Sequence, residues 1–122
     1  MIGSEKRFFM CDQLTLDEIT TKVVQAAKEV FGEKLEQVIL YGSYARGDHD
    51  DESDVDIMVV ADIPHEDCWK EYKRISDLTW SLDLEHDVLV SICITDSDTF
   101  RTYASILPFY LNVLHEGVSL IA

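Results

Sequence analysis

The fold of this chain is decided by YGSYARGD at residues 41–48 and by SDVD at residues 53–56. An apolar run over residues 37–41 leads into the first sequence, and a run rich in Val and Ile begins within the second. Both runs have the length and composition of β-strands. The glycine-serine turn therefore follows one strand, and the two aspartates lie where the next strand begins.

Helices and one more strand are expected outside this stretch. Periodic apolar spacing, capping residues and prolines predict helices over residues 15–31, 66–82 and 108–116, and a short helix over residues 97–105. A single helical turn is expected over residues 44–47, and a third strand over residues 87–95. This order predicts an α/β (α+β) fold in which a small mixed sheet carries helices mainly on one face.

The length allows one domain. A chain of 122 residues has no room for a second full core. We expect residues 1–13 to be a loosely ordered lead-in and residues 14–122 to form a single domain.

Asp54 and Asp56 are two residues apart on the expected strand, so their side chains share one face, with Cα atoms roughly 6.5 Å apart. Val55 and Ile57 then point to the opposite, buried face. Two carboxylates on one face can bind one cation or bridge two, since two-metal sites hold ions about 3.5–4 Å apart. A solvated charge run explains the acids over residues 48–52, but not two acids that interrupt an apolar strand.

Gly42 and Ser43 are candidates for binding a phosphate group. Glycine lets a phosphate approach the backbone closely, and the serine hydroxyl adds a donor at the start of a helical turn. Arg46 follows about one turn later, where its guanidinium can reach the same anion or pair with a nearby loop acid. A phosphate site beside a carboxylate pair is typical of transfer from a nucleoside triphosphate.

A third acid is expected to complete such a site, either by binding metal or by accepting a proton. Glu85 and Asp87 are the candidates, because both precede the third strand with the same parity. Asp87 is preferred because it leads directly into that strand.

Gly-Ser, ten residues and then Asp-x-Asp resembles the motif of the DNA polymerase beta-like nucleotidyltransferase superfamily. The longer pattern around it, and NVLHEGV at residues 112–118, are similar to the minimal nucleotidyltransferases of that superfamily. The resemblance covers about residues 38–118 and implies a nucleotidyltransferase fold. The third motif, DVLVS at residues 87–91, departs from the commoner Asp-Leu-Val form.

The resemblance implies an enzyme that uses two Mg²⁺ ions and transfers a nucleoside monophosphate, AMP from ATP, with another nucleoside triphosphate as the alternative. Its implied nucleotide-binding residues are Gly42, Ser43 and Arg46, and its implied catalytic and metal-binding acids are Asp54, Asp56 and Asp87. The acceptor would be a hydroxyl of a partner protein, because the chain lacks the second, acceptor-binding domain of larger relatives.

The resemblance also implies a partner. Minimal nucleotidyltransferases resemble antitoxins that modify a HEPN-type ribonuclease toxin. Two other functions stay open: a catalytically silent module that blocks a basic partner sterically, and transfer to a small molecule of the aminoglycoside type. Phe109, Tyr110 and Leu114 are either core residues or a surface for a partner or a second copy.

The composition limits the other possibilities. Ten Lys and Arg against 24 Asp and Glu give a net charge of −14, which disfavours direct nucleic-acid and membrane-surface binding. No apolar run approaches the about 20 residues of a membrane span. The three cysteines are far apart, and the N-terminus lacks the apolar stretch of a signal peptide. A cytoplasmic location is the expectation.

His65 and Cys68 have the spacing of a metal-ligand pair at the start of a helix. A zinc site built from such pairs needs a second pair, and none accompanies this one in the sequence. The favoured interpretation is therefore that both residues simply begin a helix.

Overall fold

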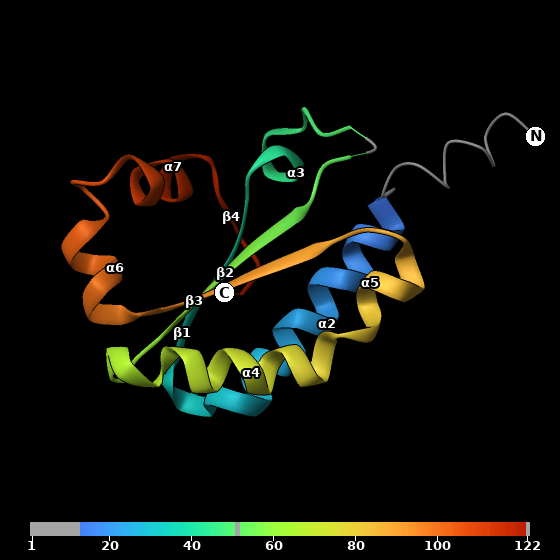
Figure 1. Ribbon diagram of the computed structural model, residues 1–122. Helices are drawn as coiled ribbons and strands as arrows, with labels where there is room; N and C mark the ends of the chain where they lie inside the picture. The colour runs from blue at the N-terminus through green and yellow to red at the C-terminus, as the bar shows by residue number, and fades with distance from the viewer. Residues whose placement is uncertain (1–12, 51, 122) are drawn as a thin grey trace, which may run out of the picture.

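A computed structural model describes residues 13–50 and 52–121 of the chain (Figure 1). Residues 1–12 of the expected lead-in lie outside this part, and Gln13 already belongs to the first described helix. The helical elements are α2 (Gln13–Phe31), η1 (Gly32–Lys34), α3 (Ser43–Arg46), η2 (His65–Asp67), α4 (Cys68–Thr79), α5 (Ser81–His86), α6 (Ser97–Tyr103) and α7 (Pro108–Glu116).

A four-stranded mixed sheet with the order β3-β2-β1-β4 forms the centre of the fold. Strand β1 (Leu35–Tyr41) is antiparallel to both β2 (Val55–Ala61) and the short β4 (Val118–Ser119). Strand β3 (Val90–Asp96) runs parallel to β2. The predicted α/β fold with a small mixed sheet is confirmed.

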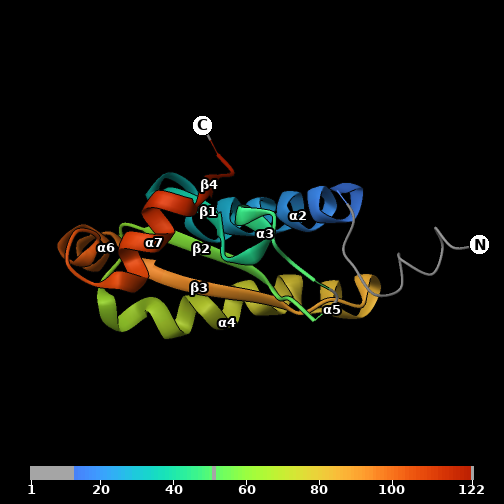
Figure 2. The ribbon, with the colours of Figure 1, turned by 90° about the horizontal axis from the view of Figure 1, so that it is seen from above.

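Side chains alternate along each strand, and this alternation builds a separate core on each face of the sheet. The longer helices α2 and α4 cover one face, where Ile19 and Ile75 belong to the same core cluster as Ile57. On the opposite face, Phe100 of α6 and Val113 of α7 belong to a smaller cluster. The expectation of helices mainly on one face thus describes α2 and α4, whereas α6 and α7 lie on the other side (Figures 1 and 2).

Two expected boundaries differ from the structure by more than the one or two residues seen elsewhere. The single helix expected over residues 66–82 is divided into α4 and α5, and α5 continues to His86. The third strand consequently begins at Val90 and not at Asp87. Asp87 ends α5 in a left-handed conformation with φ 51°, and the carboxylate of Asp83 accepts a hydrogen bond from the Val90 amide at 2.9 Å.

The sheet has two ends that matter for function. Viewed from above, α6 lies at the end of β3 where the strand finishes, and α5 lies at the end where β3 begins (Figure 2). The turn after β1 and the start of β2 lie toward the α5 end, because β1 and β2 are antiparallel. Within residues 13–50 and 52–121, we find no helix that is both long and apolar enough to span a bilayer.

Candidate nucleotide and metal site

The turn between β1 and α3 is fixed by Gly42. This residue has φ 76° and ψ −156°, a backbone conformation that residues other than glycine rarely adopt. Its carbonyl oxygen accepts hydrogen bonds from the amides of Ala45 and Arg46, both at 3.1 Å, and so starts the short helix α3. Ser43 is the first residue of that helix.

Gly42 also lies directly against Asp56. A Cβ atom added to Gly42 would overlap the Asp56 carboxylate. The close contact is possible because Asp56 pairs with Tyr41, the last residue of β1, in the antiparallel register. The structure therefore brings the glycine-serine turn and the second aspartate together, as the sequence motif requires.

Asp54 and Asp56 are both partly exposed. Asp56 has the same strand parity as Met58 and Val60, so it lies on the face of the sheet that carries α6 and α7. Among the described residues, neither carboxylate accepts a hydrogen bond or takes part in an ion pair. Burial, followed by the negative charge of Asp54, raises the pKa of Asp56 above its ordinary value, and the Arg46 guanidinium acts in the opposite direction.

This carboxylate pair fits a magnesium ion. Its donors are oxygens only, they are reached from solvent, and no cation of the described chain neutralises them by direct contact. Mg²⁺ prefers such oxygen ligands and usually keeps several waters in its coordination sphere. Asp54 and Asp56 are accordingly the residues that would hold it.

Arg46 lies at the edge of the site, and its guanidinium already has acidic partners. Its Nε is 3.1 Å from Asp48 Oδ2, and its Nη1 is 3.2 Å from Glu116 Oε2. Hydrogen bonds to Asp48 and then to Glu116 raise the pKa of Arg46 further. The loop-acid pairing considered from the sequence is therefore present, and binding of a phosphate by Arg46 stays a prediction.

Asp87 does not join the other two acids in this structure. Among the described residues, the carboxylate oxygens of Asp54, Asp56 and Asp87 do not all come within 4.8 Å of one another. The β3 residue that pairs with Asp56 is Ser91, and Asp87 precedes it by four positions. The alternative acid, Glu85, forms an ion pair with Lys22 of α2 at 3.4 Å. The third-acid role of Asp87 stays a prediction.

Tyr41 is a neighbour of the site to which the sequence analysis assigns no role. Burial, together with the nearby Cys93 and Asp56, raises the pKa of Tyr41 to about 12. Its ring meets Phe109 of α7 edge-on, with centroids 5.7 Å apart. The pairing of the last residue of β1 with the second aspartate is the signal that could have identified it.

The chain is similar to known proteins. A family model described as "Nucleotidyltransferase domain" matches residues 21–108. "Putative protein adenylyltransferase MJ0604" of Methanocaldococcus jannaschii is 33% identical over 94 residues, which cover 77% of this chain and 86% of that protein. "Putative protein adenylyltransferase MJ0141" of the same organism is 39% identical over 75 residues, 61% of this chain and 73% of its own length.

A solved structure described as a toxin-antitoxin with AMP-PNP is also similar. Its TM-score is 0.53 at 21% sequence identity, and the match covers 84% of this chain and 73% of that chain. At this identity the likeness shows a shared fold.

Proposed function

The chain belongs to the nucleotidyltransferase-domain family, and we propose that it transfers AMP from ATP, with magnesium, to a hydroxyl group of a partner protein. The partner is a HEPN-type toxin that this chain neutralises as an antitoxin. Two curated relatives named as putative protein adenylyltransferases support the reaction, and a similar structure described as a toxin-antitoxin with AMP-PNP supports an ATP-like nucleotide and a toxin as the partner.

The observation that carries this proposal is the contact between the turn and the carboxylates. Gly42 packs against Asp56, so a triphosphate that lies over the turn also lies beside the acidic pair. The charge of that pair has no direct partner in the described chain, and a metal-bound triphosphate would supply one. Nucleotidyl transfer requires this combination, because its catalysis depends chiefly on positioning and charge neutralisation.

At the α-phosphorus the reaction forms one bond and breaks one bond, and the acceptor hydroxyl also loses its proton. The acceptor hydroxyl oxygen bonds to the α-phosphorus of ATP, the bond from that phosphorus to the bridging oxygen breaks, and pyrophosphate leaves. Gly42 and Ser43 would bind the triphosphate, with Arg46 at its edge. Bound magnesium would supply positive charge beside the reacting phosphate. We assign the acceptor proton to Asp87, which requires residues 87–89 to turn toward Asp56 when the acceptor binds.

A protein acceptor suits the surface beside the site. Tyr110 of α7 packs against the smaller core cluster, whereas Phe109 and Leu114 are 46% and 50% exposed. Phe109 also contacts Tyr41, the strand partner of Asp56. An apolar side chain exposed this close to the carboxylates is available to a partner that presents its hydroxyl group.

The experiment incubates the chain with magnesium, its HEPN-type partner and ATP labelled at either the α- or the γ-phosphate. We expect the α-label to appear on the partner and the γ-label to stay in solution as pyrophosphate. Asp54→Ala combined with Asp56→Ala should abolish the labelling, whereas Asp62→Ala, an acid beyond the other end of β2, should not. Neutralisation that survives the double change without any label would show that the chain acts sterically instead.

The third acid is tested separately. Asp87→Asn should slow the α-label transfer if Asp87 accepts the proton, while Glu85→Gln should leave the rate unchanged. The two changes remove the same charge from neighbouring positions, so they form a matched pair. Equal rates for both variants would remove Asp87 from the mechanism without affecting the assignment of Asp54 and Asp56.

A further inference from the structure

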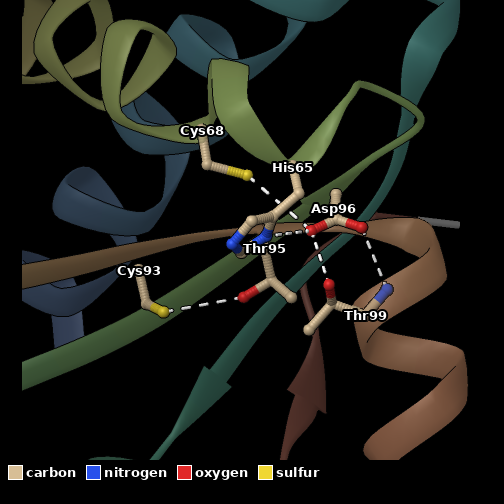
Figure 3. A network of polar contacts seen from close by, with 6 residues as sticks. All are labelled: His65, Cys68, Cys93, Thr95, Asp96 and Thr99. Carbon is tan, nitrogen blue, oxygen red and sulfur yellow. Dashed lines mark hydrogen bonds and ion pairs between the residues drawn. The ribbon is translucent and has the colours of Figure 1, made fainter.

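A second group of metal-ligating side chains lies at the opposite end of β3 from the proposed nucleotide site. His65 comes from η2, Cys68 is the first residue of α4, and Asp96 is the last residue of β3 (Figure 3). Their ligand atoms all lie within 4.8 Å of one another. The fold thus supplies, 28 residues after Cys68, the additional ligand that no nearby sequence pair provides.

The distances between the ligand atoms are close to those of a coordinated metal. Nδ1 of His65 is 2.9 Å and Sγ of Cys68 is 3.9 Å from the same oxygen, Oδ1 of Asp96. A tetrahedral zinc site separates its nitrogen, oxygen and sulfur ligands by roughly 3.3–3.6 Å, given metal bonds of about 2.0–2.3 Å. The two separations from Oδ1 thus differ from those of a zinc site by roughly 0.3–0.4 Å, and the nitrogen and the sulfur lie within 4.8 Å of each other.

Asp96 is held in place by groups that would remain bonded in a metal complex. Its side chain is only 4% exposed and caps α6. The amide of Thr99 donates to Oδ2 at 2.9 Å, and the Thr99 hydroxyl donates to Oδ1 at 2.7 Å. A carboxylate has about four acceptor positions, two on each oxygen. Thr99 occupies one position on each oxygen, so one position on Oδ1 is available to a metal ion. Such outer partners orient metal ligands in known sites.

The donor set selects the class of metal. One imidazole nitrogen, one sulfur and one carboxylate oxygen suit zinc and similar transition metals, and a sulfur ligand does not suit magnesium. A groove of about 480 Å³ adjoins both His65 and Cys68, so a water or another small ligand can reach a fourth position. His65 itself is 79% exposed and can turn its ring without disturbing the core.

We propose that His65, Cys68 and Asp96 bind a divalent transition metal, zinc in the first instance, at a site separate from the magnesium-binding carboxylates. The metal ties the start of α4 to the corner between β3 and α6. On binding, the metal takes the place of the protons on His65 Nδ1 and Cys68 Sγ that now face Asp96 Oδ1, and these protons are released to solvent. This inference does not depend on the proposed transfer reaction.

The test is a titration of the chelator-treated protein with Co²⁺, which replaces zinc and reports its ligands in the absorption spectrum. We expect one equivalent to bind and to produce a thiolate-to-cobalt charge-transfer band. His65→Ala and Cys68→Ser should each weaken binding by more than the about 10–100-fold that loss of a supporting second-shell partner costs. The Cys68→Ser protein should also lack the charge-transfer band. An excess of Mg²⁺ should leave the spectrum unchanged, because magnesium takes oxygen ligands.

The controls use the same residue types elsewhere in the chain. Cys93→Ser removes a thiol that lines the same groove but lies outside the cluster, and His115→Ala removes a histidine of α7. Both variants should bind Co²⁺ like the parent protein. The proposal is overturned if no charge-transfer band forms, if Mg²⁺ displaces Co²⁺, or if Cys93→Ser weakens binding as much as Cys68→Ser. Because His65 is exposed, its alanine variant is expected to fold and keeps the test decisive.

Discussion

Asp56 and Asp96 lie at opposite ends of the β2–β3 pair, and they differ in a way that burial alone does not explain. Asp96 is the more buried of the two, with 3% of its surface exposed. Burial acts to raise the pKa of Asp96, yet hydrogen bonds from Thr99 and His65 lower it overall. The pKa of Asp56 is instead raised, by burial and then by the charge of Asp54.

The difference shows what each carboxylate is arranged for. Asp96 has its charge satisfied by donors of its own chain, so it stabilises the fold and can serve as an oriented ligand. Asp56 lies beside a second acid and accepts no hydrogen bond from the described residues, which costs stability in the absence of a cation. Unsatisfied charge of this kind marks functional sites, because a bound ligand can supply the missing partner.

The largest expected effect is on the rate of nucleotidyl transfer, which should depend on the Asp56 end of the β2–β3 pair and not on the Asp96 end. Asp54→Asn or Asp56→Asn should lower the rate of nucleotidyl transfer by roughly 100- to 1,000-fold or more, because the metal-bound triphosphate loses a charged ligand. His65→Ala should leave the rate within about twofold of the parent protein, a change of less than 0.5 kcal/mol in the activation barrier. The effect should be small because His65 lies at the other end of the β2–β3 pair from Asp56. Rates of α-label transfer at saturating ATP measure both. A large loss of transfer rate in His65→Ala would show that both ends of the sheet contribute to catalysis.

The next effect concerns the turn that touches Asp56. Gly42→Ala should reduce transfer by roughly ten- to 100-fold, because the added Cβ displaces the Asp56 carboxylate from its position. Gly47→Ala is the matched control, since Gly47 also has a positive φ, 83°, but nothing lies within 4 Å of its added Cβ. Gly47→Ala should lose about 1–2 kcal/mol of stability from its left-handed backbone, and Gly42→Ala about 1–3 kcal/mol, because its ψ of −156° lies in a region almost exclusive to glycine.

Transfer rates and urea unfolding of the two glycine variants together decide this point. Equal losses of activity at Gly42 and Gly47 would mean that strain alone, and not the contact with Asp56, controls the site.

The next effect concerns the contribution of Asp96 to the stability of the fold. Asp96→Ala should lower the free energy of unfolding at pH 7 by roughly 1–3 kcal/mol, because the capped amide and hydroxyl of Thr99 lose a charged acceptor. Since the folded-state pKa of Asp96 is lowered, its contribution is present above the unfolded value of about 3.9 and is lost as pH falls through the folded value. Urea unfolding at several pH values measures the difference, with the exposed Asp98→Ala as control. A loss that does not shrink in acid would argue against the carboxylate charge.

The smallest effect has the opposite sign. The raised pKa of Asp56 means that its ionisation destabilises the folded protein as pH rises from about 3.9 through the folded value. Asp56→Asn should therefore raise the melting temperature slightly at pH 7, by a free energy within the roughly 0–1 kcal/mol range of partly exposed charge pairs. The gain should vanish below pH 4. Thermal unfolding that shows a loss at pH 7 would reveal a donor to Asp56 and weaken the contrast with Asp96.

Much of the nucleotidyltransferase fold is predictable from local sequence. The glycine-serine turn and the Asp-x-Asp strand identify the family, and the family match and the mixed sheet confirm that prediction. The contact of Gly42 with Asp56 follows from an antiparallel pair whose two strands are consecutive in the chain, so that the end of β1 lies beside the start of β2. The two-residue strand β4 is too short to give a periodic signal of its own.

The register of β3 is not predictable in the same way. This strand is parallel to β2, so its position depends on how far the intervening helices run. Helix α5 extends to His86, and Asp87 serves as its left-handed end, a role that aspartate tolerates better than most residues. Ser91 consequently takes the place beside Asp56. Likewise, Asp96 meets Cys68 and His65 only through tertiary structure, and no local pattern indicates that contact.

The central claim is that the turn at Gly42 and the acids Asp54 and Asp56 bind a metal-loaded nucleotide as one site. The most direct measurement is a crystal structure of the protein grown with AMP-PNP and Mn²⁺, with the ion located by its anomalous scattering. We expect manganese at the Asp54 and Asp56 carboxylates and the triphosphate over Gly42 and Ser43. Manganese bound away from both aspartates, or a triphosphate on another surface of the protein, would contradict it.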